Sequence, residues 1–261
     1  MLSIVLPSYN ESKNIQNAYI EIKEVLSEAK IPFELVYVND GSKDDTWTKI
    51  EEIIEKGKAE LKQSRIRGVS FSRNFGKEAA ILAGLANATG EACVVMDCDM
   101  QHPPETLVEM YRLWQEGYEV VEGVKRTRGK ESLVYKSSAK LFYRLMTKAT
   151  GIDMSRASDF KLMDRKVVKS ILSMPERNMF FRGLSSWVGF KKTEVEFDVR
   201  EREFGTSKWS KWSLVKYAVK NIAAFSTVPM QFVTIAGTLT LLGALILGIQ
   251  TLVRYFTGHA V

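Results

Sequence analysis

Residues 230–253 form an unbroken run of 24 residues that carry no charge. At a rise of about 1.5 Å per residue, a helix of this length spans the roughly 30 Å of hydrocarbon in a bilayer. Lys and Arg are frequent before the run, whereas only Arg254 follows it. We therefore expect a transmembrane helix over residues 228–256, with the preceding residues in the cytoplasm. Gly237, Gly243 and Gly248 would let another helix pack closely against this one, which is compatible with a homo-oligomer.

Before this run, short apolar segments alternate with segments of helical periodicity. We expect strands at residues 3–6, 33–38, 67–71, 92–97 and 119–123, with a helix after each of the first four. Residues 158–161 are expected to be a short link before a helix at 165–172, and residues 193–200 a further strand. This alternation predicts an α/β domain over residues 1–207, with a mostly parallel sheet covered on both faces.

Charge is unevenly divided along the chain. Residues 1–124 hold 13 Lys and Arg against 21 Asp and Glu, a net charge of −8, and residues 125–261 hold 24 against 10, a net of +14. This division disfavours a nucleic-acid-binding protein and favours a basic surface that faces phosphates or an anionic membrane. Trp209 and Trp212 lie among lysines, so we expect residues 208–227 to form an amphipathic membrane-interface helix, with an ordinary surface helix as the alternative. A second amphipathic helix is expected at 135–148.

Two carboxylates, Asp97 and Asp99, lie at the end of the fourth expected strand. Ligands of open α/β sheets bind at the carboxyl ends of strands, and such a pair offers the hard oxygen ligands that Mg²⁺ or Mn²⁺ prefers. Taken alone, the pair is more often two solvated turn residues. The chain has neither a Gly-x-Gly-x-x-Gly fingerprint nor a P-loop, so a metal ion and basic side chains would have to bind any nucleotide phosphates. Cys93 and Cys98 lack metal-type spacing, and we interpret them as reduced thiols.

Two basic stretches are candidates for binding phosphate. Residues 125–131 contain Arg126 and Arg128, and residues 200–208 contain Arg202 and Lys208 around a flexible glycine. A solvated connection is the alternative interpretation of the first stretch. Asp159, in the expected link, is either a functional carboxylate or a helix-capping residue.

Five motifs occur in order along the chain: Pro7-Ser8-Tyr9-Asn10-Glu11, Asn39-Asp40-Gly41-Ser42-x-Asp44, Arg73-Asn74-Phe75-Gly76-Lys77, Asp97-x-Asp99-x-Gln101-His102-Pro103-Pro104-Glu105 and Arg202-x5-Lys208. In these motifs the chain resembles the family 2 glycosyltransferases, which have the Rossmann-like GT-A fold. More narrowly, it is similar to polyprenyl-phosphate glycosyltransferases, such as dolichyl-phosphate mannose synthases and bacterial bactoprenol glucosyltransferases. The resemblance covers nearly the whole chain. Relatives of the bacterial type commonly carry two or more C-terminal membrane helices, so we interpret the sequence as truncated before a second one.

The resemblance implies roles for individual residues. The nucleotide-sugar would be bound by Pro7, Tyr9, Glu11, Asp40, Asp97, Cys98, Asp99, Gln101, Arg202 and Lys208. Within this set, Mg²⁺ or Mn²⁺ would be held by Asp97, Asp99 and Gln101. The acceptor phosphate would be bound by Arg126, Arg128 and Lys208. The catalytic residues would be Asp159, which matches the family's proposed base, and Asp99.

The implied activity is an inverting transfer of one sugar from UDP-glucose or UDP-N-acetylglucosamine to undecaprenyl phosphate, at the cytoplasmic face of the cell membrane. A phosphate monoester has a second pKa near about 6, so near neutral pH a base would find little proton to remove. Asp159 would then orient the acceptor or stabilise the positive anomeric centre. Three alternatives are open: a GDP-mannose-dependent mannose synthase, transfer to a non-lipid glycan or protein acceptor, and a catalytically inactive membrane scaffold. The scaffold is disfavoured because Asp97, Asp99 and Asp159 are all present.

Overall fold

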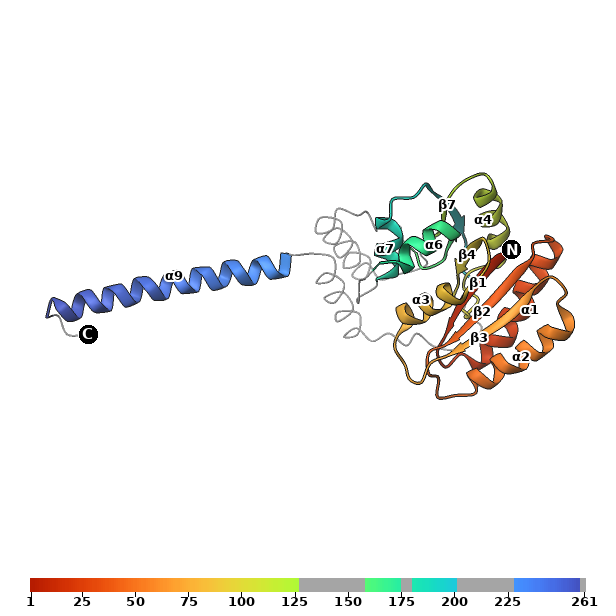
Figure 1. Cartoon of the computed structure of the whole chain (residues 1–261), viewed down its shortest axis with the longest axis horizontal. Helices are drawn as coiled ribbons and strands as arrows, with labels where there is room; N and C mark the ends of the chain where they lie inside the picture. Colours follow the sequence, from red (N-terminus) through yellow and green to blue (C-terminus); the bar gives the residue numbers. More distant parts are fainter. Residues whose placement is uncertain (127–157, 175–179, 201–227, 259–261) are drawn as a thin grey trace. The chain divides into compact units, whose positions relative to one another are not determined.

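The computed structural model describes residues 1–126, 158–174, 180–200 and 228–258, which belong to two compact units (Figure 1). The strands of the first unit are β1 (Leu2–Ser8), β2 (Phe33–Asn39), β3 (Arg65–Ser70), β4 (Ala92–Val95), β5 (Val120–Lys125), β6 (Lys161–Asp164) and β7 (Lys192–Phe197). Its helices are α1 (Ser12–Glu28), α2 (Thr46–Glu60), α3 (Lys77–Asn87), α4 (Glu105–Gln115), α6 (Arg165–Leu172) and α7 (Phe181–Trp187). The described part of the second unit contains α9 (Val228–Phe256).

The seven strands form one sheet in the order β3-β2-β1-β4-β6-β5-β7. Strand β6 runs antiparallel to both of its neighbours, β4 and β5, while the other four pairings are parallel. The predicted mostly parallel α/β sheet is therefore confirmed. The prediction of a link through Lys161 is wrong, because the short segment Lys161–Asp164 becomes a strand by pairing on both sides. Its own four residues carry no alternation that marks a strand.

Both faces of the sheet are covered by helices, because alternate strand residues point to opposite sides. Leu2, Ile4 and Leu6 of β1 pack in a core cluster with α1, α2 and α4, whereas Val5 packs in a second cluster with α3, α6 and α7. Burying such a side chain fully contributes roughly 1.5–3 kcal/mol. Helix α3 approaches the sheet closely at Gly84, where an added Cβ would lie 2.2 Å from a methyl carbon of Val5.

Parallel pairing gathers the loops that follow β1, β2, β3 and β4 at one edge of the sheet. Ser8 pairs with Asn39, which in turn pairs with Ser70, and Val5 pairs with Val95 near the end of β4. The antiparallel strand β6 begins at this same edge, since its first residue, Lys161, pairs with Val95. The segments before β6 and after β4 therefore meet, although they are far apart in the sequence.

Helix α9 has 29 residues, and its segment Met230–Phe256 is long and apolar enough to cross a membrane, with a mean hydropathy of 2.2 over an 18-residue window. The hydroxyls of Thr234, Thr238, Thr240 and Thr251 donate to carbonyls one turn earlier, which satisfies these polar groups within the helix. The predicted apolar helix at residues 228–256 thus forms over those residues. The predicted interface helices at 135–148 and 208–227 lie outside the described residues.

Candidate active site

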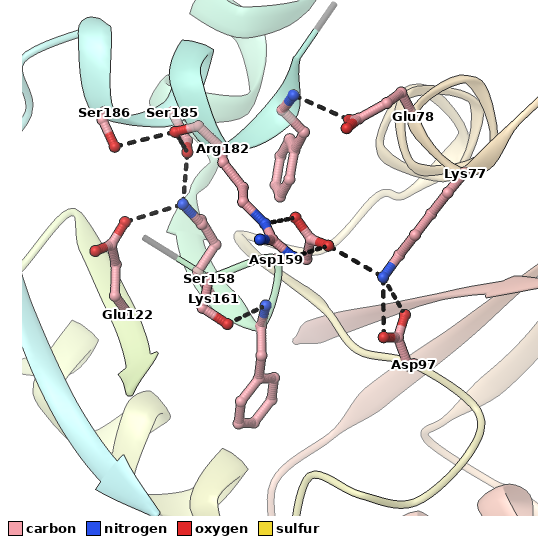
Figure 2. A network of polar contacts seen from close by, with 12 residues as sticks. Lys77, Glu78, Asp97, Glu122, Ser158, Asp159, Lys161, Arg182, Ser185 and Ser186 are labelled. Atoms are coloured by element: carbon pink, nitrogen blue, oxygen red, sulfur yellow. Dashed lines mark hydrogen bonds and ion pairs between the residues drawn. The ribbon is translucent and has the colours of Figure 1, made fainter. Parts of the chain in front are cut away.

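Asp97 and Asp159 are brought together by the antiparallel pairing of β4 with β6. Asp97 lies two residues after the end of β4, and Asp159 lies two residues before the start of β6. Lys77, the first residue of α3, reaches between them. Its Nζ lies 2.7 and 2.9 Å from the two carboxylate oxygens of Asp97, and 3.1 Å from Oδ2 of Asp159 (Figure 2). One ammonium group therefore links two carboxylates that are 62 positions apart.

Arg182 on α7 completes this arrangement with two hydrogen bonds to Asp159. Its Nε donates to Oδ1 at 2.7 Å and its Nη2 donates to Oδ2 at 2.9 Å. Asp97, Lys77, Asp159 and Arg182 thus form a row of alternating charges. Burial by itself would raise the pKa of Asp159, but the charges of Lys77 and Arg182 outweigh it and keep that pKa well below its usual range. The pKa of Asp97 is also lowered, because the attraction of Lys77 outweighs the effect of burial.

Arg182 is held in place by contacts of α7 on two sides. The Lys161 ammonium is fully buried, lies 2.9 Å from Oε1 of Glu122, and donates to Oγ of Ser185 at 2.6 Å. The hydroxyls of Ser185 and Ser186 donate to the carbonyl of Arg182 at 3.2 and 3.0 Å. At the start of the helix, the backbone N–H of Phe181 donates to Glu78 of α3 at 2.9 Å (Figure 2). Helix α7 is therefore fixed to both the sheet and α3.

Asp99, the other carboxylate of the pair, follows Cys98 and is 7% exposed. Its Oδ1 accepts the backbone N–H of Gln101 at 3.2 Å, and the intervening Met100 has a left-handed φ of +56°. This tight turn places Asp97, Asp99 and Gln101 on one short segment after β4. The Cys98 thiol is buried against the Ser8 hydroxyl at 3.1 Å, and burial raises its pKa, so it stays protonated.

The loops after β1, β2 and β3 meet around Asp40. The Asp40 carboxylate accepts the backbone N–H groups of Phe75 at 2.7 Å and Gly76 at 3.0 Å, and its own N–H donates to the carbonyl of Ser8 at 2.9 Å. Burial raises the pKa of Asp40 in spite of these two hydrogen bonds. Gly41 is required beside it, because its φ is +62° and an added Cβ would lie 2.3 Å from the backbone of Arg73.

Two further residues of the expected nucleotide site, Tyr9 and Glu11, follow β1 at this same edge of the sheet, and Pro7 lies in β1 itself. The backbone N–H of Glu11 donates to Oγ1 of Thr46 at 2.8 Å, which ties the first loop to α2. The backbone carbonyl of Pro7 lies 3.9 Å from the Cys98 thiol. The structure therefore brings the expected nucleotide residues of the first two motifs next to the segment that carries Asp97 and Asp99.

Of the four basic residues expected to bind phosphate, Arg126 alone falls in the described part of the chain. It is exposed at the end of β5, and its Nη1 lies 3.0 Å from a carboxylate oxygen of Asp198, just after β7. The other three, Arg128, Arg202 and Lys208, lie outside the described residues. Arg200 ends the described segment that follows β7, and its backbone N–H donates to the carbonyl of Gln101 at 3.1 Å.

Three residues of the site, namely Lys77, His102 and Arg182, were assigned no role from the sequence. Lys77 and His102 lie in the recognised motifs, whereas Arg182 has no sequence signal because its position depends on α7. The His102 ring stacks on Phe160 with centroids 4.6 Å apart, and its buried Nδ1 has no hydrogen-bond partner among the described residues. Burial lowers the pKa of His102, so the ring is neutral at neutral pH.

The doubly covered, mostly parallel sheet, with carboxylates gathered where its strands end, is the arrangement expected for the GT-A fold. A sequence model of the family described as glycosyl transferase family 2 matches residues 3–172. The chain therefore belongs to this family and is a glycosyltransferase, as the motifs predicted.

Two curated relatives and one solved structure show what the chain is similar to. It is 44% identical over 238 residues to an uncharacterized glycosyltransferase, YkcC, of Bacillus subtilis, covering 91% of this chain and 72% of that one. It is 36% identical over 248 residues to a prophage bactoprenol glucosyl transferase homolog of Escherichia coli, covering 95% and 79%. The structure of a mannosyltransferase from Pyrobaculum calidifontis in complex with GDP-Man and Mn²⁺ matches with a TM-score of 0.53 at 15% identity, covering 99% of this chain and 81% of that one. The last similarity concerns the fold.

Proposed function

We propose that this chain transfers one sugar from a nucleotide-sugar to a polyprenyl phosphate at a membrane. The observation that carries this proposal is the Lys77 link between Asp97, at the strand-end motif, and Asp159, before β6. It joins a carboxylate suited to donor binding to one suited to the reacting centre. Relatives named bactoprenol glucosyl transferases and the apolar helix α9 support a lipid acceptor.

Asp97, Asp99 and Gln101 are suited to bind a divalent cation together with the donor diphosphate. They supply two carboxylates and one amide on a single turn, and among the described residues no cluster of three or more His, Cys, Asp or Glu side chains forms a complete metal cage. A partial set of hard oxygen ligands fits Mg²⁺ or Mn²⁺, which shares its remaining positions with phosphates and water. When bound, such an ion neutralises charge that develops on the leaving nucleoside diphosphate.

The reaction forms one bond and breaks one bond at the anomeric carbon. An oxygen of the acceptor phosphate attacks this carbon, and the bond to the nucleoside diphosphate breaks on the opposite face, so the configuration inverts. The acceptor phosphate is largely dianionic at neutral pH and needs no base. Asp159, whose pKa is kept low mainly by Lys77 and Arg182 against the effect of burial, is a poor base. It stabilises the positive charge of the anomeric centre and orients the sugar.

The excess of Lys and Arg before α9 supports a cytoplasmic active site at the inner face of the cell membrane. Arg126 is placed at the end of β5, where an exposed guanidinium can exchange Asp198 for an acceptor phosphate. Arg128, Arg202 and Lys208 complete the proposed set of phosphate-binding residues.

For the donor, we propose UDP-glucose or UDP-N-acetylglucosamine, with GDP-mannose as the alternative. Glucosyl transferase names among the relatives support a glucose donor. The test is to incubate membranes containing the full chain with each radiolabelled nucleotide-sugar and undecaprenyl phosphate, and to measure label in the lipid fraction. Label in lipid from one donor identifies it, whereas transfer only to water-soluble acceptors overturns the lipid acceptor.

A further inference from the structure

Lys77 is unequally important to its two carboxylate partners. Its ammonium contacts both oxygens of Asp97 but only one oxygen of Asp159. Asp159 is also held by the two hydrogen bonds from Arg182, whereas among the described residues Lys77 is the only ion-pair partner of Asp97. Movement of Lys77 away from Asp97 would therefore leave Asp159 paired and in place.

Lys77 and a divalent cation compete for the same carboxylate. An ammonium that contacts both oxygens of Asp97 occupies lone-pair sites that a metal ion could use, and it places a like charge at contact distance from the metal. The donor changes this competition, because its diphosphate offers Lys77 new anionic oxygens. When metal and donor bind together, Asp97 binds the metal and Lys77 binds the diphosphate. When the metal binds by itself, Lys77 loses Asp97 and gains no new anionic partner.

The backbone around Lys77 is fixed while its side chain can change partners. Gly76, directly before it, and Phe75 both donate their N–H groups to the buried carboxylate of Asp40. The Lys77 side chain is 36% exposed, and its four-carbon stem can turn without moving α3. Its starting point is thus set by Asp40, one of the residues proposed to bind the nucleotide.

We propose that Lys77 is an exchangeable counter-ion: it pairs with Asp97 until the donor binds, and then leaves Asp97 for the donor diphosphate as the metal is bound. This inference rests on the proposed donor site, and it adds when Lys77 leaves Asp97 relative to the binding of donor and metal. It follows that a divalent cation binds weakly by itself and much more tightly with a nucleoside diphosphate.

The test measures Mn²⁺ binding instead of sugar transfer. The full chain in detergent is titrated with Mn²⁺, alone and with UDP or GDP, and free Mn²⁺ is followed by electron paramagnetic resonance. The same nucleotide is titrated with Mn²⁺ without protein, so that Mn²⁺ bound by nucleotide in solution is subtracted. Wild type is expected to bind Mn²⁺ at least about tenfold more tightly when one of these nucleotides is present. Lys77→Met is expected to bind Mn²⁺ alone at least about tenfold more tightly than wild type, because the competing charge is gone.

Two control variants separate charge from packing. Lys77→Arg keeps the cation and should bind Mn²⁺ alone as weakly as wild type. Lys58→Met removes an exposed lysine that pairs with Glu55 on α2, and should leave every Mn²⁺ affinity unchanged. Circular dichroism of each variant checks that it is folded.

The outcomes distinguish this inference from the proposed function. If Mn²⁺ binds to wild type equally well with and without nucleotide, or if Lys77→Met binds Mn²⁺ alone no more tightly than wild type, the exchange is wrong while the donor site stands. If wild type binds no Mn²⁺ even with nucleotide, the proposed donor site is wrong and the exchange is overturned with it. If Lys77→Met does not fold, Lys77→Gln, which also removes the charge, replaces it in the titration with Mn²⁺ alone, and an affinity no higher than that of wild type overturns the exchange.

Discussion

Arg182 and Asp159 form a two-point ion pair, with Nε 2.7 Å from one carboxylate oxygen and Nη2 2.9 Å from the other. Such planar pairing fixes the orientation of a carboxylate as well as its charge. Lys77 adds a second cation to the same carboxylate (Figure 2). Asp159 is therefore an oriented, permanently ionised group, which suits it to stabilise positive charge and makes it a weak proton acceptor.

Arg182→Lys should lower kcat by about tenfold or more while leaving the donor KM nearly unchanged. The lysine keeps the positive charge but cannot make both parallel hydrogen bonds, so Asp159 loses its fixed orientation. Arg182→Gln, which also removes the charge, should lower kcat further. Initial rates with the labelled donor measure both effects.

Ser186→Ala is the matched control for Arg182, because it removes only one hydrogen bond to the Arg182 carbonyl on the same helix. Its kcat should stay within about twofold of wild type. A kcat of Arg182→Lys equal to that of Ser186→Ala would show that the orientation of Asp159 does not matter for the reaction.

The pH profile of transfer distinguishes the two roles proposed for Asp159. Its pKa is lowered by Lys77 and Arg182 against the effect of burial, so it stays ionised as the pH falls below the ordinary range of a carboxyl group. The acceptor phosphate instead takes up a proton near about pH 6, so the rate should fall as the pH decreases through that value. Asp159→Asn should lower the rate by a similar factor at every pH, keep this acidic limb, and leave donor affinity nearly unchanged. Loss of the limb in Asp159→Asn would identify Asp159 as the titrating base.

Much of the fold was predictable because its signals are local. Strands β1, β2 and β4 are apolar runs that end in polar turns, and α9 contains an uncharged segment of membrane length. Strand β6 was missed because its four residues become a strand only between β4 and β5. Helix α7 was missed as well, being only seven residues long.

Residues of the candidate site were predictable where the strands and helices that carry them were predictable. Asp97 and Asp99 were recognised from their motif and Asp159 from the family resemblance, and the structure places Asp97 and Asp159 on either side of Lys77. Arg182 was not recognised, since its approach to Asp159 follows from the two missed elements, β6 and α7. Asp40 was expected only to bind the nucleotide. The structure adds that it holds the loop before Lys77, because both of its carboxylate oxygens accept backbone N–H groups of that loop.

Asp99→Ala should abolish transfer and metal-dependent nucleotide binding while leaving the fold intact. Asp99 makes a hydrogen bond to the N–H of Gln101 within its own turn, so its loss affects the proposed metal ligands directly and the sheet very little. Calorimetry of nucleotide binding with and without Mn²⁺ measures the effect. Asp45→Ala, at an exposed helix start without a side-chain cap, serves as the control and should bind like wild type. Retained transfer by Asp99→Ala would contradict its metal role.

Lys161→Met should destabilise the protein by about 3–5 kcal/mol, because it leaves Glu122 buried without its cation. The double variant Lys161→Met, Glu122→Gln should recover most of this loss, since no uncompensated charge remains in the core. Unfolding by denaturant, followed by circular dichroism in detergent, measures both changes.

The recovered double variant also tests whether this buried pair serves the active site. It still lacks the hydrogen bond from Lys161 to Ser185, which fixes α7 and with it Arg182. Its kcat should therefore remain below wild type even where its stability is restored, with the donor KM little changed. A double variant with wild-type stability and wild-type kcat would limit the Lys161–Glu122 pair to a role in folding.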